Sequence, residues 1–275
     1  MSHRLEWTVV GAAALLLAAT GCGGAQPTAV PLPDTASGLA VAPDFAGTLW
    51  ETTGSHPWRS QDGGSTWQPV RGRGGGLDIA FTEQGGEIVG AHGAQKGDYG
   101  GDGMLGPRRT PSTFVSITTP YHRTDRLYAL DLFGHLWLSV DAGRHWTQLR
   151  AARLPAACSG LGAVRGDVIK PDVVYAACGA NGLWRSVDDG ATFTHVSGPP
   201  DPRAVAMTTD DQNRILVAAG DGVYLSTDDG RTFLPVLRRK VDAIAFDPRN
   251  RRLAYAAAGR TLLRSVDGGE SWPSS

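Results

Sequence analysis

The sequence predicts an all-β protein, a six-bladed β-propeller of four-stranded antiparallel blades, and three observations support this prediction. A phrase of eight residues recurs five times, beginning at Ser60, Ser139, Ser186, Ser226 and Ser265. Each copy lies between two short apolar or alternating runs, as a tight turn lies between the strands of a hairpin. The later copies are about 40 residues apart, a period typical of propeller blades that contain four short strands.

The repeated phrase has the residues of a turn. Its clearest copy, 186–193, reads S-V-D-D-G-A-T-F. The Asp side chain can accept hydrogen bonds from backbone N–H groups two residues on, and the Gly two positions later can adopt the left-handed conformation. The closing aromatic residue offers apolar surface to the neighbouring hairpin. We therefore predict structural roles for Asp62, Asp141, Asp188, Asp228 and Asp267, and for Trp67, Trp146, Phe193, Phe233 and Trp272.

The intervals between these aspartates indicate the number of units. They are 79 residues from Asp62 to Asp141, then 47, 40 and 39 residues. The first interval is about twice the last two, so it should contain one unit that has lost its phrase. That unit has strand-like runs at 77–81 and 87–89, followed by an irregular insertion at 95–109. Long irregular loops on a regular scaffold are often functional.

The last unit shows the strand pattern best. Its predicted strands are 241–246, 253–258 and 262–265, with a short fourth strand at 271–272. Similar runs occur earlier at 39–43, 48–50, 126–130, 204–207 and 215–218. Because the fourth strand is short, we expect residues 29–33 to lie against it and cover the exposed sheet edge.

The pattern S-x-D-x-G-x-[T/S/H]-[W/F] resembles the Asp-box, or BNR, repeat of sialidases, sortilin-like receptors, xyloglucanases and photosystem II assembly factors. The resemblance covers the entire chain that would follow an N-terminal export signal. It implies a propeller in which the boxes lie on the rim away from the ligand-binding face. It does not imply one activity, because the same scaffold carries enzymes, receptors and assembly factors.

The N-terminus has the layout of an export signal. A weakly basic start precedes an apolar run at 9–19, which is too short to span a bilayer comfortably. The residues that follow, Ala19-Thr20-Gly21-Cys22, resemble a bacterial lipobox. We therefore expect a signal peptide at 1–21, lipidation of Cys22, a flexible tether at 22–35 and a propeller at 36–275, held on the extracytoplasmic face of the cell membrane. A plain secretory signal with a coincidental cysteine is the alternative.

Export would also permit a disulfide between Cys158 and Cys178. These cysteines flank two strand-like runs, 161–164 and 173–177, which are joined by a turn. Antiparallel pairing of the two runs would place the sulfur atoms opposite each other. The alternative is two buried free thiols.

Charge separates the two predicted faces of the propeller. The chain has a formal net charge of −1 with 19% charged residues, which argues against a disordered or nucleic-acid-coating protein. The links between units carry many basic residues and few acidic ones, chiefly Asp78, Asp201 and Asp242, whereas the boxes are acidic. The basic residues are Arg71, Arg73, Arg108, Arg109, Arg150, Arg153, Arg203, Arg238, Arg239 and Lys240.

A basic concave surface concentrates anionic ligands. We therefore predict a monomeric binding module for an anionic glycan or a protein partner of the cell envelope, and no nucleic-acid partner. The predicted ligand-binding residues are Arg71, Arg73, Asp98, Tyr99, Arg108, Arg109, Arg153, Arg203 and Arg239. The alternative is that the arginines are solvated or paired with neighbouring acids.

Three histidines, His56, His92 and His135, should lie on loops of the same face in three consecutive units. Gathered imidazoles can bind a transition metal or transfer protons. Packing within the loops is the simpler explanation, so we predict neither a metal nor another cofactor.

The alternative function is an exo-acting, sialidase-like glycoside hydrolase with its active site on the basic face. Glycoside hydrolysis generally requires two carboxylates flanking one bond. The candidates are Glu51, Asp78, Asp98, Asp102 and Asp131, and their spacing singles out no pair. The Arg-Ile-Pro motif of sialidases is missing, and its nearest counterpart, Arg153-Leu154-Pro155, lies in the middle of the chain. We therefore prefer the binding module.

Overall fold

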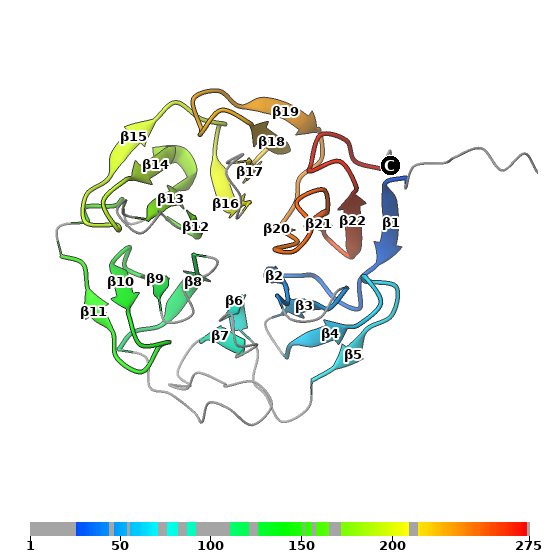
Figure 1. Cartoon of the computed structure of the whole chain (residues 1–275), viewed down its shortest axis with the longest axis horizontal. Coiled ribbons are helices and arrows are strands. Elements are labelled where there is room, and N and C mark those ends of the chain that lie inside the picture. Colours follow the sequence, from blue (N-terminus) through cyan, green and yellow to red (C-terminus); the bar gives the residue numbers. More distant parts are fainter. Residues whose placement is uncertain are drawn as a thin grey trace, which may run out of the picture.

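The computed structural model describes residues 26–43, 47–53, 56–70, 76–81, 87–91, 111–120, 126–150, 152–155, 158–164, 172–208 and 214–273. Within these ranges, antiparallel sheets form a ring around a central axis, which confirms an all-β propeller of four-stranded antiparallel blades (Figure 1). Five sheets have four strands each. A two-stranded sheet, β6 (Gly76–Phe81) with β7 (Glu87–Ala91), lies in the ring between two of them.

The first four-stranded blade contains β2 (Gly38–Val41), β3 (Leu49–Thr52), β4 (Trp58–Ser60) and β5 (Gln68–Pro69). The next contains β8 (Phe114–Thr118), β9 (Leu127–Asp131), β10 (Leu136–Ser139) and β11 (Thr147–Gln148). It is followed by β12 (Gly160–Val164), β13 (Val173–Ala177), β14 (Leu183–Ser186) and β15 (Thr194–Val196), then by β16 (Pro202–Met207), β17 (Ile215–Ala219), β18 (Val223–Ser226) and β19 (Leu234–Leu237). The last blade contains β20 (Ala243–Phe246), β21 (Ala254–Ala258), β22 (Thr261–Ser265) and β1 (Thr28–Pro31).

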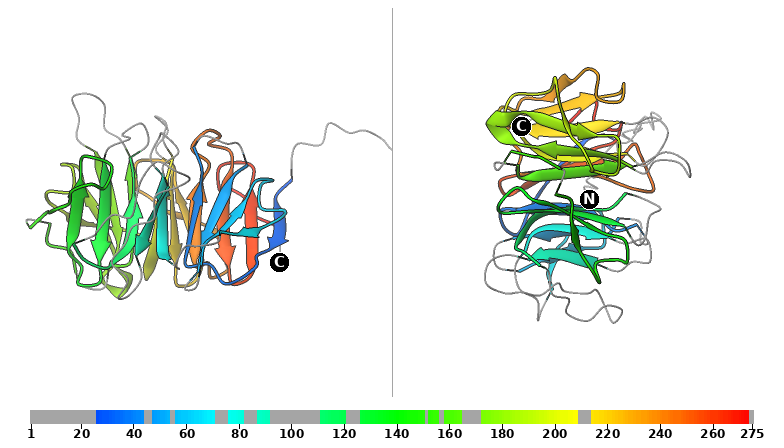
Figure 2. Two further views of the ribbon diagram at one scale, coloured as in Figure 1. Left: turned by 90° about the horizontal axis from the view of Figure 1, so that it is seen from below. Right: turned by 90° about the vertical axis from the view of Figure 1, so that its left-hand side faces the viewer.

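The chain winds outward in each blade, so the first strands of all six sheets surround the axis (Figure 1). The strands run roughly along that axis, and their connections gather on two opposite faces (Figure 2). The box face carries the repeated phrases and the loops between first and second strands. The link face carries the links between sheets and the loops between second and third strands.

Apolar side chains hold neighbouring sheets together. The described residues form six buried clusters, and each lies between two adjacent sheets. In one of them, Tyr128 of β9 packs with Leu161 of the next blade and with Phe193, the aromatic residue that closes the next box. The box aromatics therefore pack between blades, as predicted.

The box turns use the predicted residue types, but the Asp side chain accepts its hydrogen bonds from a residue further along the chain than predicted. In the copy at 186–193, Asp188 accepts hydrogen bonds from the N–H and hydroxyl of Thr192, four residues on rather than two. The Ser186 hydroxyl donates to Asp188 and accepts from the Gly190 N–H. Asp62 accepts the same kinds of hydrogen bond in the first box, and they lower its pKa to about 2. The hydrogen bond from the Thr66 side chain has the largest effect.

Glycine is required in the box for conformation and for space. Gly190 has a φ of 79°, and the preceding residue, Asp189, is also left-handed at 60°. A Cβ at Gly190 would lie 3.0 Å from Leu136 and 3.4 Å from Tyr128, both in the preceding blade. The turn therefore packs directly on its neighbour, where a larger residue would not fit.

The N-terminal strand completes the last blade. Strand β1 pairs antiparallel with β22, with Ala29 opposite Leu263. This confirms the predicted cover for the sheet edge, but the predicted strand at 271–272 does not form, and β1 takes the outermost position instead. Trp272 packs between the last two blades, against Leu216 among others. Residues 28–31 thus belong to the propeller, which extends closer to the N-terminus than residue 36.

A disulfide joins Cys158 and Cys178, as predicted. The two cysteines flank the antiparallel pair β12 and β13, whose register places Gly160 opposite Ala177. The described residues include one short 3₁₀ helix, Gly179–Asn181. No helix in the described ranges is long and apolar enough to cross a membrane.

Candidate functional site

The structure describes part of the predicted ligand-binding surface. On the link face, Arg150 and Arg153 lie between β11 and β12, and Arg238, Arg239 and Lys240 lie between β19 and β20. The other predicted site residues, Cys22, Arg71, Arg73, His92, Asp98, Tyr99, Asp102, Arg108 and Arg109, lie outside the described residues.

The described basic residues of the link face divide into paired and unpaired groups. Arg203 forms an ion pair with Asp201 at 2.5 Å, and the Lys240 ammonium lies 3.9 Å from Asp242. By contrast, Arg150, Arg153, Arg238 and Arg239 have no acidic partner within the described part of the chain. These four arginines contribute positive charge to the described part of the link face.

The box face is less uniformly acidic than predicted. Arg126 lies between Asp172 and Asp189, with nitrogen-to-oxygen distances of 3.0 and 2.5 Å. Arg214 pairs with Glu270 at 2.7 Å. Acids and arginines on this face are therefore partly paired with each other.

Asp131 holds the loop between β9 and β10 in one conformation. One carboxylate oxygen accepts hydrogen bonds from the Phe133 and His135 N–H groups, both at 2.9 Å. The other accepts from Trp137 Nε1 at 3.0 Å and lies 3.1 Å from His135 Nδ1. Burial by itself would raise the pKa of Asp131, but these hydrogen bonds outweigh it and lower the pKa. The residue is thus a structural anion, unsuited to act as a general acid.

The loop that Asp131 holds presents an apolar tip on the link face. Leu132 and Phe133 are 56% and 69% exposed. The Leu132 N–H donates to the Thr113 carbonyl, and Gly134 has a φ of 78° that allows the tight turn. Two adjacent exposed apolar side chains on a fixed loop can contribute to an interaction site.

Two arginines follow the outermost strand of the blade that carries this apolar tip. The Leu149 N–H donates a hydrogen bond to the Leu136 carbonyl, which extends the pairing of β11 with β10. In this register Arg150 lies opposite His135. Arg153 follows in the link to β12. We call Leu132, Phe133, Arg150 and Arg153 the tip surface. Sequence reasoning found the arginines but missed the apolar pair, although its signal, D-L-F-G between two strands, was visible.

Three catalytic candidates lie within the described residues: Glu51, Asp78 and Asp131. Glu51 is fully buried. Neither carboxylate oxygen has a hydrogen-bond partner among the described residues. Burial raises its pKa to about 8; Asp34 adds to the effect and Arg260 opposes it. Glu51 and Asp131 lie in different blades with the β6–β7 sheet between them, so they cannot flank one glycosidic bond.

The two described histidines of the predicted cluster are also separated by the β6–β7 sheet. His56 precedes β4, where its ring lies 5.1 Å from that of Trp58, and His135 contacts Asp131. No group of three or more His, Cys, Asp or Glu side chains able to hold a metal ion occurs in the described ranges. Both rings pack within their own loops.

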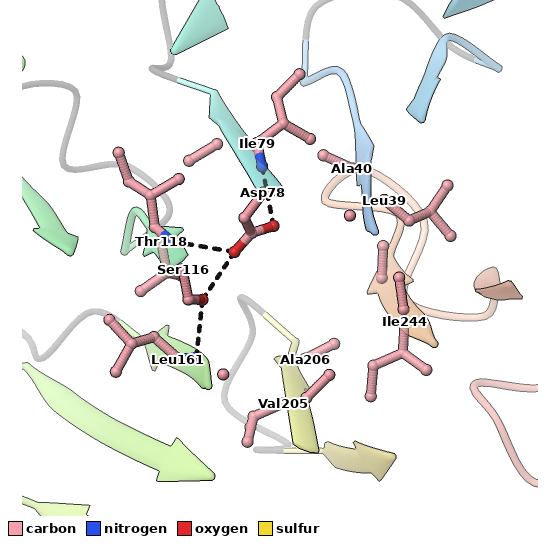
Figure 3. Close-up of a pocket in the computed structure, with 18 of the residues that line it drawn as sticks. Leu39, Ala40, Asp78, Ile79, Ser116, Thr118, Leu161, Val205, Ala206 and Ile244 are labelled. Atoms are coloured by element: carbon pink, nitrogen blue, oxygen red, sulfur yellow. Dashed lines mark hydrogen bonds between the residues drawn. The ribbon is translucent and has the colours of Figure 1, made fainter. Parts of the chain in front are cut away.

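The first strands of the six sheets enclose a central cavity of about 210 Å³ (Figure 3). Most of its lining is apolar, including Leu39, Ile79, Val205 and Ile244. Asp78 of β6 is the one charged side chain among the described residues that line it. We call this space the central channel.

Hydrogen bonds tie Asp78 to the next two sheets. Its Oδ2 accepts from the Ser116 hydroxyl at 2.7 Å and from the Ile117 N–H at 3.0 Å, while Oδ1 accepts from its neighbour, the Ile79 N–H. Ser116 Oγ in turn accepts from the Leu161 N–H of β12 (Figure 3). Burial raises the pKa of Asp78 to about 6, because its penalty outweighs these hydrogen bonds.

Comparison with known proteins supports the fold. No family model matches the sequence, and no curated protein sequence is similar enough to count as a relative. Among solved structures, the GH74 enzyme of Niastella koreensis has a TM-score of 0.59 at 20% identity, and the match covers 84% of this chain and 36% of that one. The GH74 xyloglucanase of Xanthomonas campestris has a TM-score of 0.55 at 21% identity, with 83% and 36% covered. The chain thus spans about a third of the length of these enzymes.

YCF48 from Cyanidioschyzon merolae matches over most of both chains. Its TM-score is 0.54 at 17% identity, and the match covers 90% of this chain and 88% of YCF48. A further match is YCF48 bound to D1 peptide, with a TM-score of 0.52 at 16% identity, covering 90% and 84%. At these identities the similarity establishes the propeller fold and leaves the activity open.

Proposed function

We propose that this protein is a binding module that holds an anionic partner on its link face. The observation that carries the proposal is the tip surface. The side chains of Leu132 and Phe133 are exposed there, and the link that leaves the same blade carries Arg150 and Arg153, which have no acidic partner among the described residues. The tip is ordered before binding because Asp131 and Thr113 hold its backbone. Such preorganisation lowers the entropic cost of association.

The chemistry of the tip surface favours a protein segment over an anionic glycan. Leu132 and Phe133 match an apolar side chain, whereas Arg150 and Arg153 match acidic residues on either side of it. YCF48, a propeller of similar fold, has been solved with a D1 peptide bound, so this fold is compatible with peptide binding. An anionic glycan is the alternative that the experiment below tests.

The similarity of fold to GH74 enzymes makes catalysis the competing proposal. Glu51 is buried without access and Asp131 is occupied by hydrogen bonds, which argues against it. Asp78 lines the central channel, but no second carboxylate does so among the described residues. A panel of aryl glycosides tests this directly, and we expect no turnover. Clear turnover that disappears in Asp98→Ala or Asp102→Ala would contradict a function restricted to binding.

Selection from a displayed library of random peptides on the immobilised full chain tests the binding proposal. We expect selected peptides to place an apolar residue next to Asp or Glu. Their affinity should fall about tenfold or more in Phe133→Ser and in Arg153→Glu, as is common for central interface residues. The matched controls on the box face, Val187→Ser and Arg231→Glu, should bind as the wild type does.

Two outcomes would overturn the proposed partner. Equal affinity of the selected peptides for the Phe133→Ser variant and the wild type would exclude the tip surface. A glycan array that yields a ligand sensitive to Arg153→Glu, with no peptide selected, would replace the protein partner by a glycan.

We further propose that the chain is exported and anchored through a lipid on Cys22. The export-like sequence at 1–22 and the Cys158–Cys178 disulfide, which is typical of oxidising compartments, support this location. We also propose that β6 and β7 are the inner strands of a sixth blade, since β6 lies between β2 and β8 around the channel.

A further inference from the structure

We propose that the central channel binds a small organic cation, a primary ammonium group on a short alkyl stem, with Asp78 as its counter-ion. This site is separate from the tip surface and does not depend on the proposed function. Asp78 projects from β6 toward the interior of the ring, with Leu39, Val205 and Ile244 around that space (Figure 3).

Among the residues that the structure describes, the carboxylate in this channel has no cationic partner. Its three hydrogen-bond donors, Ile79 N–H, Ile117 N–H and the Ser116 hydroxyl, are all neutral. No other titratable side chain lines the channel from β2, β6, β8, β12, β16 or β20, within the residues that the structure describes. A partly buried anion without a counter-charge is costly, and a cation entering the channel would relieve that cost.

The pattern of hydrogen bonds determines which kind of cation fits. Oδ2 already accepts two hydrogen bonds, whereas Oδ1 accepts one and retains a free acceptor position. A guanidinium group requires both oxygens for bidentate binding, but an ammonium group can bind through Oδ1 alone. A transition metal ion needs several ligands, and one carboxylate does not supply them.

The size and polarity of the channel select the rest of the ligand. Its volume of about 210 Å³ equals that of about seven water molecules at roughly 30 Å³ each, enough for an amine of four carbons. Leu39, Val205 and Ile244 would cover the alkyl stem. Gly38 allows β2 to pack closely beside the carboxylate, since a Cβ at this position would lie 2.8 Å from Asp78 Cα and 3.0 Å from Asp78 Oδ1.

Isothermal titration of the full chain with n-butylammonium tests this site. At pH 7.5 we expect saturable binding to the wild type and to Asp242→Asn, a matched acid on the link face, but not to Asp78→Asn. At pH 6 binding should release protons, because the cation favours the ionised carboxylate. The neutral analogue n-butanol should bind much more weakly.

If Asp78→Asn does not fold, the pH dependence of n-butylammonium affinity in the wild type still tests the proposal. Since burial raises the pKa of Asp78 to about 6, affinity at pH 5 should be about tenfold lower than at pH 7.5. Affinity that does not change between these pH values would overturn the proposal. So would undiminished binding to a folded Asp78→Asn variant, or equal binding of n-butanol.

Discussion

Glu51 and Asp131 are both buried carboxylates, but their surroundings have opposite effects on their pKa values. Asp131 accepts hydrogen bonds from the loop it organises, and its pKa is lowered. Glu51 has no such donors, and burial raises its pKa to about 8. The equivalent positions in the other four-stranded blades, judged by strand register, are small apolar residues: Ala129, Ala176, Val217 and Ala256. Glu51 is therefore an ionisable group in an apolar position.

Replacing Glu51 with valine should stabilise the protein at neutral pH. The folded-state pKa of about 8 lies above the ordinary glutamate value of 4.5, so the wild type loses stability as pH rises between these values. At pH 7 the penalty is about 3 kcal/mol. We expect Glu51→Val to recover about 2 kcal/mol there, after the cost of repacking.

Urea unfolding of wild type and Glu51→Val at pH 5 and pH 7.5 measures this effect. The difference between the two proteins should be larger at pH 7.5. A difference that is the same at both pH values would mean that Glu51 is not buried in the neutral form.

Residue types and spacing could not distinguish these two carboxylates. Both follow apolar residues near the end of a predicted strand, and both therefore qualified as catalytic candidates. The difference depends on the Phe133 and His135 N–H groups and on Trp137, which only the folded loop brings to Asp131. The pairing of Arg203 with Asp201 is local and could have been anticipated from their spacing of two residues.

The box turn is the element that sequence predicted most completely. Its Asp, its left-handed Gly and its aromatic residue all have the expected roles. We did not predict that the residue before the Gly is also left-handed, although it is Gly63 or Gly268 in two copies and Asp189 or Asp229 in two more, all residue types that tolerate this conformation. Only Ala142 is unusual there. We also did not predict that the buried Ser186 hydroxyl joins the two ends of the turn.

Removing that hydroxyl should destabilise one blade measurably. In Ser186→Ala the buried Gly190 N–H loses its acceptor, and we expect unfolding to be easier by about 1–3 kcal/mol. Val187→Ala, at the exposed neighbouring position, should change stability by less than about 0.5 kcal/mol. Urea midpoints of the two variants provide the comparison, and equal midpoints would assign the serine no structural role.

The whole molecule is closed by a strand from the opposite end of the sequence. Strand β1 covers the edge of β22, and Leu32 is buried between the last blade and the first. Composition at 22–35 suggested a flexible tether, yet the exposed edge of the last sheet indicated that residues 29–33 cover it, and residues 28–31 do pair there, with β22. The need to pair the edge of the last sheet therefore determines the structure of residues 28–31 more than their local composition does.

Truncation tests this closure. A chain lacking residues 1–32 should unfold several degrees lower than one lacking residues 1–25, because a sheet edge and the Leu32 contact are both lost. It should also self-associate through the exposed β22 edge, which size-exclusion chromatography would detect. Equal melting temperatures would show that β1 contributes little to closure.

The division of the molecule into a structural box face and a binding link face is the central claim. Amide hydrogen exchange of the full chain, with and without an excess of a peptide selected as described above, tests it most directly. We predict slower exchange at 131–135 and 149–155 in the presence of peptide, with no change in the box turns at 60–67, 186–193 and 226–233. Protection of the box turns without any change at 131–135 would contradict this account.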